Sequence, residues 1–598
     1  MRFSRALSLS ATAATVASTV LPRQNLPSNA TAAPYSLPNT RNAQARSAQI
    51  TTIRSGFEYG PDIIEGEGVY WPKGPYADQM INFDQTTFFA EQLPWVGRCE
   101  ADAAAAAQAV AQSGGLASLE DWFKFYEMGF KNTVPTGPYP GMLSNGTSDL
   151  LFSMERLSTA PFGVRRLAAG TLMSFQTDDA IARNLTTMTQ AELLDAGRLF
   201  YVDYRDQLNM TVTAGRYAGA AEAFFFLHPE TDQFLPLSIR LNRGSSLVYT
   251  PTDDADDWLF AKLAFNMNDL WYQQWYHLET THVLVDIVFE AAVRSLSPDH
   301  PIYAIMDRLA YQTFAFRIST IKTLLNKGGP VDELFFASGS DAGSYAAHLY
   351  HDAGAGDWLK TDFLTDLSLR GLIGSGPPLP HYPFFEDGIV ILGAISEFMT
   401  AYVTSYYADD QAVESDPELA SFVKEAVPAG IIDFPTSICS RSELVSLLTH
   451  FAMQASVIHA ATNGNTPVKS TASLPYHPMA FYQPLPSTKG LSNLVPFMPN
   501  LTQSAGQITL LAAFNRPFIS ETNPTGANRT LAEMFDLPDF LARANAETRQ
   551  ANTLFKTQMS AFSQVVQARA FDEDGLSQGM PFIWTSLDPL NTPFYLTV

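Results

Sequence analysis

The stretch Tyr276-His277-Leu278-Glu279-Thr280-Thr281-His282-Val283 carries two histidines five residues apart in an otherwise apolar, aromatic-rich segment. A third histidine lies far downstream in Val457-Ile458-His459-Ala460-Ala461-Thr462-Asn463-Gly464, with an asparagine four residues after it. The sequence ends at Phe594-Tyr595-Leu596-Thr597-Val598, without a polar tail. Three imidazoles, one amide oxygen and one terminal carboxylate would make a hard, mostly neutral ligand set for one divalent transition metal. The candidate ligands are therefore His277, His282, His459, Asn463 and Val598.

The spacing of these residues sets conditions on their backbone. Residues four apart on an α-helix project about 40° from one another, so His459 and Asn463 share a face. Residues five apart project about 140° from one another, so His277 and His282 cannot reach one ion from a regular helix. A single π-type turn would bring them together. The sequence therefore predicts a π-turn between His277 and His282, whereas the alternative is that both are ordinary core histidines.

Several runs around these motifs resemble the lipoxygenase core signature. They are Asp257–Lys262, Asn268-Asp269, Leu296–Ile302, Tyr382–Gly388 and the terminal aliphatic residue. Three further runs are similar to the secreted fungal manganese lipoxygenases: Gly141–Asn145, Leu151–Ser158 and Gly575–Phe582. The terminal Val598 is also typical of that subgroup, since most iron lipoxygenases end in isoleucine. The resemblance extends from about residue 140 to residue 598.

The resemblance implies a mainly α fold, in which long buried helices of a lipoxygenase catalytic domain carry the metal ligands. No run of alternating short strands precedes this region, so no N-terminal β-barrel domain is expected. A chain of 598 residues with 46% hydrophobic residues can bury one large core or two domains. No linker or break in composition follows residue 60, which favours a single catalytic domain. We expect a signal peptide at residues 1–17, a flexible leader at 18–56 and the catalytic domain at 57–598.

The N-terminal segment favours secretion. Arg2 and Arg5 precede a weakly hydrophobic stretch at residues 6–21 with small residues near Ala17, as in a signal peptide; a disordered N-terminus is the alternative. Six sequons for N-linked glycosylation agree with secretion: Asn29, Asn145, Asn184, Asn209, Asn500 and Asn528. No uninterrupted apolar run reaches about 18 residues, so no transmembrane helix is expected.

Charge and cysteine content limit the possible partners. The net charge of −23 argues against binding to nucleic acid or to anionic membranes. It also repels a fatty-acid carboxylate at long range, so substrate recognition must be local and largely hydrophobic. Cys99 and Cys439 could form one disulfide, and their pairing stays open. We expect a monomer.

The resemblance also implies the chemistry. A hydroxide on the trivalent metal takes a hydrogen atom from a bis-allylic carbon, and O₂ then adds to the resulting radical. The hydroxide is the catalytic group, so no catalytic side chain is assigned. Gln273 or Gln274 is the candidate for orienting the ligands from outside the metal's own shell, with a surface role as the alternative.

Family positions map onto a set of candidate substrate-pocket residues. Leu324 corresponds to a clamp over the reactive carbon, with Val331 and Phe335 further along; plain core positions are the alternative. Arg516 matches an arginine that holds the fatty-acid carboxylate, although a structural ion pair is an equal alternative. Thr320 falls where the family commonly has Gly or Ala and would narrow the oxygen pocket, although a slip of one residue would place Ser319 there.

Three functions agree with these features. The first is a secreted manganese dioxygenase that converts linoleic and α-linolenic acids to 11- and 13-hydroperoxides. The second is an iron enzyme on the same scaffold that gives a 13- or 9-hydroperoxide. The ligand types do not separate the two metals, because manganese is disfavoured at any such site by intrinsic affinity. The third is a non-catalytic secreted glycoprotein that binds lipids.

Overall fold

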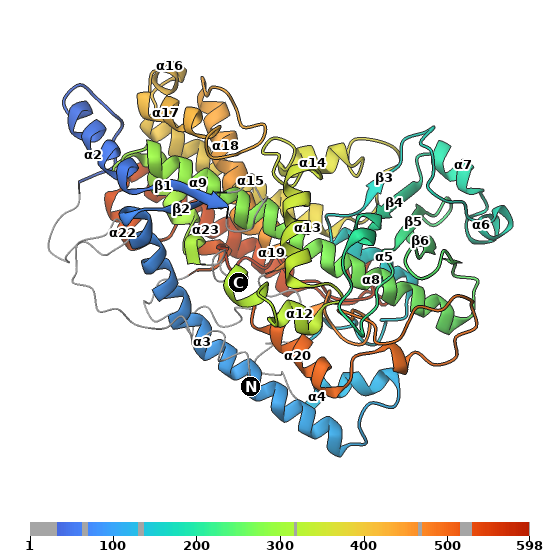
Figure 1. Cartoon of the computed structure of the whole chain (residues 1–598). Coiled ribbons are helices and arrows are strands. Elements are labelled where there is room, and N and C mark those ends of the chain that lie inside the picture. The colour runs from blue at the N-terminus through green and yellow to red at the C-terminus, as the bar shows by residue number, and fades with distance from the viewer. Residues whose placement is uncertain are drawn as a thin grey trace.

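The computed structural model describes residues 33–62, 70–128, 137–315, 320–463, 469–514 and 529–596. Most of these residues are helical, which confirms the expected mainly α fold (Figure 1). The described strands form a two-stranded hairpin, β1 (Glu58–Asp62) with β2 (Tyr70–Lys73), and one five-stranded sheet. The expected signal peptide lies outside the described residues.

A long helix with a π-helical break runs through the core. It consists of α8 (Ala255–His277), the π-helix η4 (Leu278–Val283) and α9 (Leu284–Ser295). Asp256 and Asp257 lie in its first turn, where carboxylates interact favourably with the helix dipole. The Asp257 carboxylate also accepts hydrogen bonds from the Gly490 and Leu491 amides at 2.7 and 3.1 Å, which fixes this end. Nearly every later residue is buried, including charged ones such as Asp269 and Glu290.

A second broken helix lies against the first. It consists of α18 (Arg441–Met453), the π-helix η6 (Gln454–Ile458) and the short α19 (His459–Thr462). It begins with a capping box, in which Ser440 accepts from the amide of Glu443 and the Glu443 carboxylate accepts from the amide of Ser440. Residues of η4 pack directly against η6, so the two π-turns face one another.

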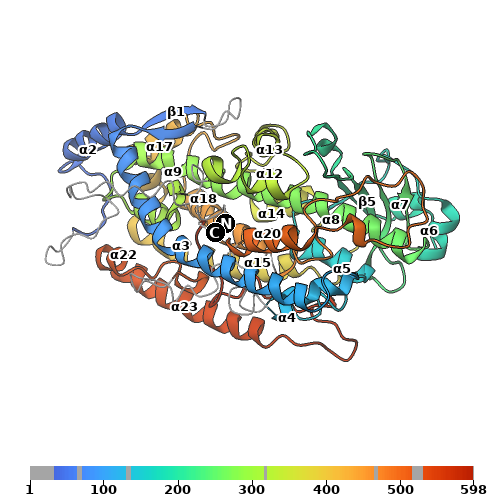
Figure 2. The same cartoon turned by 60° about the horizontal axis from the view of Figure 1, so that its bottom comes forward.

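Further helices enclose this pair. α15 (Pro383–Tyr406) packs against α18 on one side and α23 (Ala546–Gln567) on the other. The 38-residue α3 (Pro75–Gln112) crosses the molecule alongside α20 (Leu501–Ala512), as Figure 2 shows.

Two helical segments are long and apolar enough to cross a membrane by length and composition. They are Pro383–Tyr406, whose most apolar window is 44% buried, and Arg441–Thr462, whose window is 89% buried. The second segment is an internal core helix and includes a candidate metal ligand. The absence of a transmembrane helix remains a prediction.

The five-stranded sheet lies at one end of the molecule, on the right of Figure 1. Its strands follow one another in chain order and pair antiparallel: β3 (Arg165–Arg166), β4 (Leu199–Asp203), β5 (Glu222–Leu227), β6 (Phe234–Arg240) and β7 (Val248–Tyr249). Every residue of β5 is buried, because one face packs on the helical core and the other on a smaller cluster around Phe224 and Phe226.

Only part of the expected flexible leader at residues 18–56 can be compared with the structure, because residues 18–32 lie outside the described residues. Residues 43–56 form α2 (Ala43–Gly56), which packs on α9. Arg46 is 4% exposed and donates two hydrogen bonds to the Glu418 carboxylate, at 2.5 and 2.9 Å. This buried ion pair fixes a segment that its composition suggested would be flexible.

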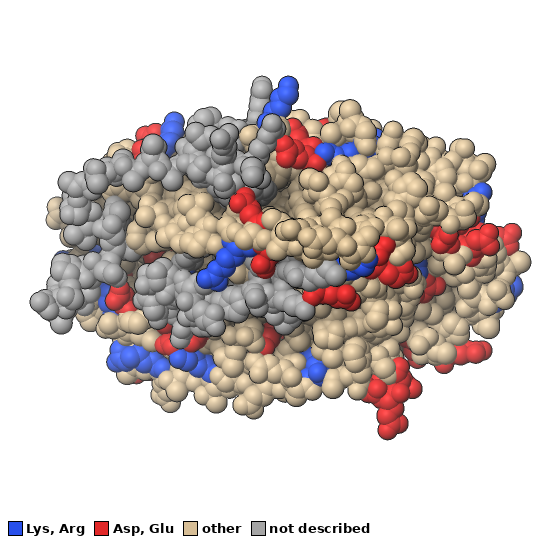
Figure 3. All heavy atoms as spheres, turned by 90° about the horizontal axis from the view of Figure 1, so that it is seen from below, with Lys and Arg blue, Asp and Glu red and all other residues tan. Residues whose placement is uncertain are grey.

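The surface and the cysteines add two observations. On the face shown in Figure 3, acidic and basic side chains are interspersed among uncharged ones, without a continuous basic stripe. Cys99 is buried and Cys439 exposed, and no disulfide joins them in the structure.

Candidate metal centre

Three histidines from the two broken helices meet in the core. His277, His282 and His459 each offer a ring nitrogen, and these nitrogens all lie within 4.8 Å of one another. The rings of His282 and His459 are closest, with centroids 4.7 Å apart, while His277 lies 5.6 and 5.7 Å from them. All three side chains are at least nine-tenths buried. Residues far apart in sequence thus form one compact donor cluster.

The π-turn predicted between His277 and His282 is confirmed, since the π-helix Leu278–Val283 spans the interval. Threonines satisfy carbonyls of this turn: the Thr281 hydroxyl donates to the carbonyl of His277 at 2.5 Å, and that of Thr280 donates to the carbonyl of Tyr276 at 3.0 Å. Such bonds compensate for the irregular backbone pairing that a π-turn creates. The turn brings both imidazoles to one side of the helix.

Asn463 joins the cluster from the end of the second helix. It is the residue after Thr462, where the backbone becomes extended, and its amide still donates to the His459 carbonyl at 2.9 Å. The Asn463 side-chain nitrogen lies 3.2 Å from Nε2 of His277. Rotating this amide by half a turn would present its oxygen at the same place, since the two orientations differ only in hydrogen bonding.

Burial favours the neutral form of two of the imidazoles, His277 and His282. It lowers the pKa of His277 to about 4, and it lowers the pKa of His282 well below the usual value, with the neighbouring imidazoles adding to the effect. His277 Nδ1 lies 3.1 Å from the carbonyl of Gln273, which fixes the tautomer in which Nδ1 donates. Nε2 of His277 is therefore an acceptor directed at the cluster.

The donor set fits a transition metal. Nε2 of His282 and Nε2 of His459 face one another at 3.1 Å. Two nitrogens that bind one ion at ~2.1 Å and at right angles lie about 3.0 Å apart. Neutral imidazoles with converging lone pairs are the form in which histidine binds metals.

The backbone carbonyl of Gln273 contacts His277, whereas its side chain bonds to other groups. Its side-chain nitrogen donates to Asp269 and to the Ala160 carbonyl, at 3.1 and 3.2 Å, away from the histidines. Asp269 also accepts from the Tyr204 hydroxyl and pairs with the fully buried Arg156 at 3.1 Å. Arg156 in turn forms an ion pair with the buried carboxylate of Glu155. The result is a charged network one to two turns from His277, made of Glu155, Arg156, Tyr204, Asp269, Gln273 and His477.

A narrow cavity adjoins the cluster. Its volume is about 50 Å³. His277 and Asn463 line it together with the predicted pocket positions Thr320, Leu324, Val331 and Phe335 and with Gln274. Five further residues complete the wall and were missed from sequence: Trp275, Leu278, Leu510, Leu511 and Phe514. They belong to apolar helical segments whose pattern is the same whether they face a core or a cavity.

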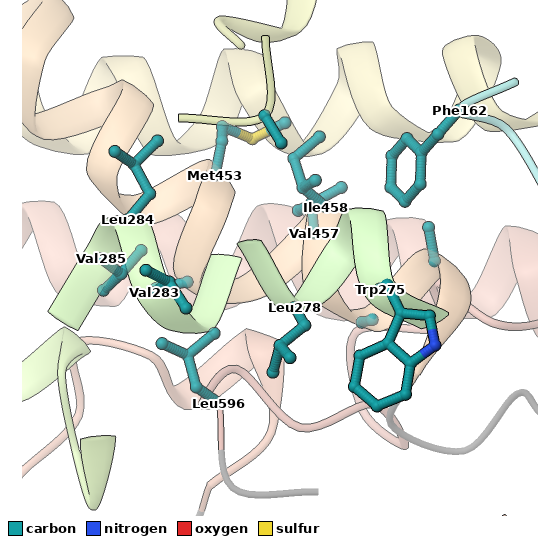
Figure 4. Close-up of a cluster of buried hydrophobic side chains, with 14 of the residues drawn as sticks. Phe162, Trp275, Leu278, Val283, Leu284, Val285, Met453, Val457, Ile458 and Leu596 are labelled. Atoms are coloured by element: carbon teal, nitrogen blue, oxygen red, sulfur yellow. The ribbon is translucent and has the colours of Figure 1, made fainter. Parts of the chain in front are cut away.

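The remaining candidate residues are the chain's last residue, an arginine and the sequons. Val598 and Arg516, like the sequons at Asn29 and Asn528, are outside the described residues. Leu596, two residues before Val598, is fully buried in one hydrophobic cluster with Leu278 and Val283 (Figure 4). Of the described sequons, Asn184, Asn209 and Asn500 are exposed, and Asn145 is partly buried.

A family model and several known proteins match this chain. The family model described as Lipoxygenase matches residues 159–514. The chain belongs to the lipoxygenase family. Among relatives, a lipoxygenase named manganese lipoxygenase from Fusarium oxysporum is 41% identical over 571 residues, covering 94% of this chain and 92% of the relative. The manganese lipoxygenase of Pyricularia oryzae is 40% identical, covering 99% of this chain and 96% of the relative.

Solved structures agree with this placement. A structure of a manganese lipoxygenase superimposes with a TM-score of 0.91 at 40% identity, covering 94% of this chain and all of the other. Lipoxygenases add O₂ to polyunsaturated fatty acids, and the buried histidine triad of this chain is typical of the family.

Proposed function

We propose that this lipoxygenase is a secreted, monomeric manganese enzyme that converts linoleic and α-linolenic acids to 11- and 13-hydroperoxides. The proposal depends first on the convergence of three buried imidazoles on one point, and burial lowers the pKa of two of them, His277 and His282. Its ligands would be His277, His282, His459, the Asn463 amide oxygen and the Val598 carboxylate. Relatives about 40% identical over nearly the whole chain bear the name manganese lipoxygenase, which favours manganese over iron.

The chain's own residues would prepare the substrate. The metal would supply the one-electron chemistry that removes a hydrogen atom from the bis-allylic carbon. Leu324, Val331 and Phe335 line the cavity next to His277, so an apolar chain there would bring its reactive carbon beside the metal. The cavity is smaller than the roughly 300 Å³ at which ordinary ligand pockets begin, so lining side chains must change rotamer when a fatty acid enters. Arg516 would bind the carboxylate as a bidentate donor.

Metal content and products test the proposal together. Protein secreted from a fungal host would be dialysed against chelator, its metals measured by plasma mass spectrometry and its products from linoleic acid identified by chromatography. Near-stoichiometric manganese with 11- and 13-hydroperoxides is the expected result. Iron with conjugated 13- or 9-hydroperoxide would favour the iron enzyme. Folded protein with neither metal nor product would favour the non-catalytic lipid-binding glycoprotein.

A further inference from the structure

Three residues that line the cavity beside the histidines carry buried polar groups without partners in the described part of the chain. The Thr320 hydroxyl, the Gln274 side-chain nitrogen and the Trp275 indole nitrogen are all buried, and none has a hydrogen-bond partner among the residues that the structure describes. Roughly 90% or more of buried polar groups in proteins are hydrogen-bonded, so three such donors around one small cavity are unusual. Their arrangement suits a ligand that brings acceptor oxygens into an otherwise apolar space.

Thr320 is the donor on the wall that carries the candidate substrate clamp. It begins the π-helix η5 (Thr320–Leu324), and its carbonyl accepts from the amide of Leu325 at 3.1 Å. Thr320 and Leu324 both line the cavity, whereas His277 and Asn463 line it from the two long helices. A reactive carbon held between Leu324 and the histidines would therefore lie close to Thr320.

The hydroxyl of Thr320 behaves differently from those of the threonines near His277. Thr280 and Thr281 donate to carbonyls four residues earlier, which is the usual bond of a helical threonine. Thr320 is 5% exposed, and its hydroxyl makes no such bond with any described residue. Its position in the wall and its unpaired hydroxyl are independent observations that both indicate a ligand in the cavity.

We infer that the Thr320 hydroxyl donates a hydrogen bond to the oxygen that has just added to the fatty acid. The inference rests on the proposed function and deepens it. In the reaction RH + O₂ → ROOH, one C–O bond forms between O₂ and a carbon of the pentadienyl radical, and the same bond breaks if the addition reverses. The hydrogen atom removed from the substrate balances the one in the hydroperoxide. A hydrogen bond to the peroxide oxygen stabilises the adduct at the carbon that faces Thr320 and so selects the product.

Three substitutions of Thr320 separate the effect of its hydroxyl group from the effect of its size. Thr320→Val keeps the branched shape and removes the hydroxyl, whereas Thr320→Ser keeps the hydroxyl and removes the methyl group. Thr320→Ala removes both. If the size of Thr320 selected the product, the ratio of hydroperoxide isomers for the Val variant would match that of wild type, and the ratio for Ser would match that for Ala. If the hydroxyl selects it, Ser matches wild type and Val matches Ala.

The expected result is a change of about 2- to 10-fold in the ratio of hydroperoxide isomers for Val and Ala, the range of one hydrogen bond. A wild type that makes a single isomer should give a second isomer in these two variants, and the ratio for Ser should remain within about 2-fold of wild type. Metal content and melting temperature are measured for every variant, so that misfolding is recognised. An isomer ratio for Val equal to that of wild type, or the same ratio in all four proteins, overturns the inference.

A binding measurement without metal gives a second readout. The probes are linoleic acid and the alcohol obtained by reducing its 13-hydroperoxide, titrated into metal-free protein by calorimetry. Wild type and Thr320→Ser should prefer the alcohol by about 2- to 10-fold more than Thr320→Val does. An equal preference in all three overturns the role of the hydroxyl. Failure of the proposed function is a different result, since wild type would then form no hydroperoxide at all.

Discussion

The two helices that carry the histidines differ in where their π-turns lie. In the first helix the π-turn Leu278–Val283 separates His277 from His282 and turns both toward the same point. In the second helix the π-turn Gln454–Ile458 precedes His459, and the helix ends at Thr462, one residue before Asn463. The first turn therefore corrects a spacing that a regular helix could not use. The second turn lies before a pair whose spacing of four a regular helix would already place on one face.

This difference determines which parts of the site could be seen in the sequence. A spacing of five between two candidate ligands conflicts with a regular helix, and the conflict predicted the first π-turn. The spacing of four between His459 and Asn463 contains no conflict, so the second π-turn left no signal. A π-turn can thus be predicted from the sequence only where the spacing of two ligands would prevent a regular helix from directing both toward one metal ion.

The most damaging change is expected at a histidine of the first helix. His282→Ala should lower metal retention and activity by more than about 100-fold, since even residues that only support ligands cost 10- to 100-fold. Plasma mass spectrometry of the purified variant and oxygen uptake with linoleic acid measure the two effects. The matched control is His348→Ala, because the His348 side chain is 44% exposed and remote in sequence from the cluster. A His282→Ala protein that holds full metal would remove His282 from the ligand set.

The π-turn itself can be tested by changing its length. Deleting Thr280 leaves three residues between the two histidines, which then lie four positions apart. A regular helix places residues at that spacing about 40° apart, so most of the metal should be retained. Inserting one alanine after Thr280 adds a residue that the existing π-turn cannot absorb. The insertion should lower metal affinity by at least about 100-fold. Equal metal content in the deletion and insertion variants would contradict the geometric role of this turn.

Part of the fold and of the candidate site could be predicted from the sequence. The mainly helical fold is confirmed. Of the residues expected at the metal and along the pocket, six line one cavity, namely His277, Asn463, Thr320, Leu324, Val331 and Phe335. Val598 and Arg516 lie outside the described residues and stay predictions. Trp275, Leu510 and Phe514 were missed, because an apolar residue has the same sequence pattern on a cavity wall as in a core. The order of residues 43–56 was missed for a different reason. It depends on the buried pair of Arg46 with Glu418, a contact between residues hundreds of positions apart.

A smaller effect is expected at Arg516, which tests substrate orientation. Arg516→Ala should raise KM for linoleic acid by about 10-fold, the loss of one charge-assisted contact, with little change for the methyl ester. The ester is the internal control, since it carries no charge for the arginine to bind. Steady-state kinetics on both substrates give the comparison. Equal increases in KM for acid and ester would indicate that Arg516 has a structural role.

The smallest effects are expected from substitutions that remove one hydrogen bond to each of the two metal-binding helices. Tyr204→Phe removes a hydrogen bond to Asp269, which lies on the first helix eight residues before His277. Gln454→Met removes a 2.7 Å hydrogen bond to the Thr361 carbonyl from within the second π-turn, five residues before His459. Each change should lower the free energy of unfolding by about 1 kcal/mol, measured by denaturant titration.

The rate at which the two variants lose metal to a chelator should differ. Gln454→Met should release metal faster than Tyr204→Phe, because its hydrogen bond fixes the π-turn next to His459, whereas Asp269 acts through two helical turns. Tyr204→Phe also leaves the pairing of Asp269 with Arg156 in place, and that pairing keeps the first helix in position. Faster release from Tyr204→Phe would reverse this order. That result would mean that the buried charged network around Asp269 contributes more to metal retention than the π-turn Gln454–Ile458 does.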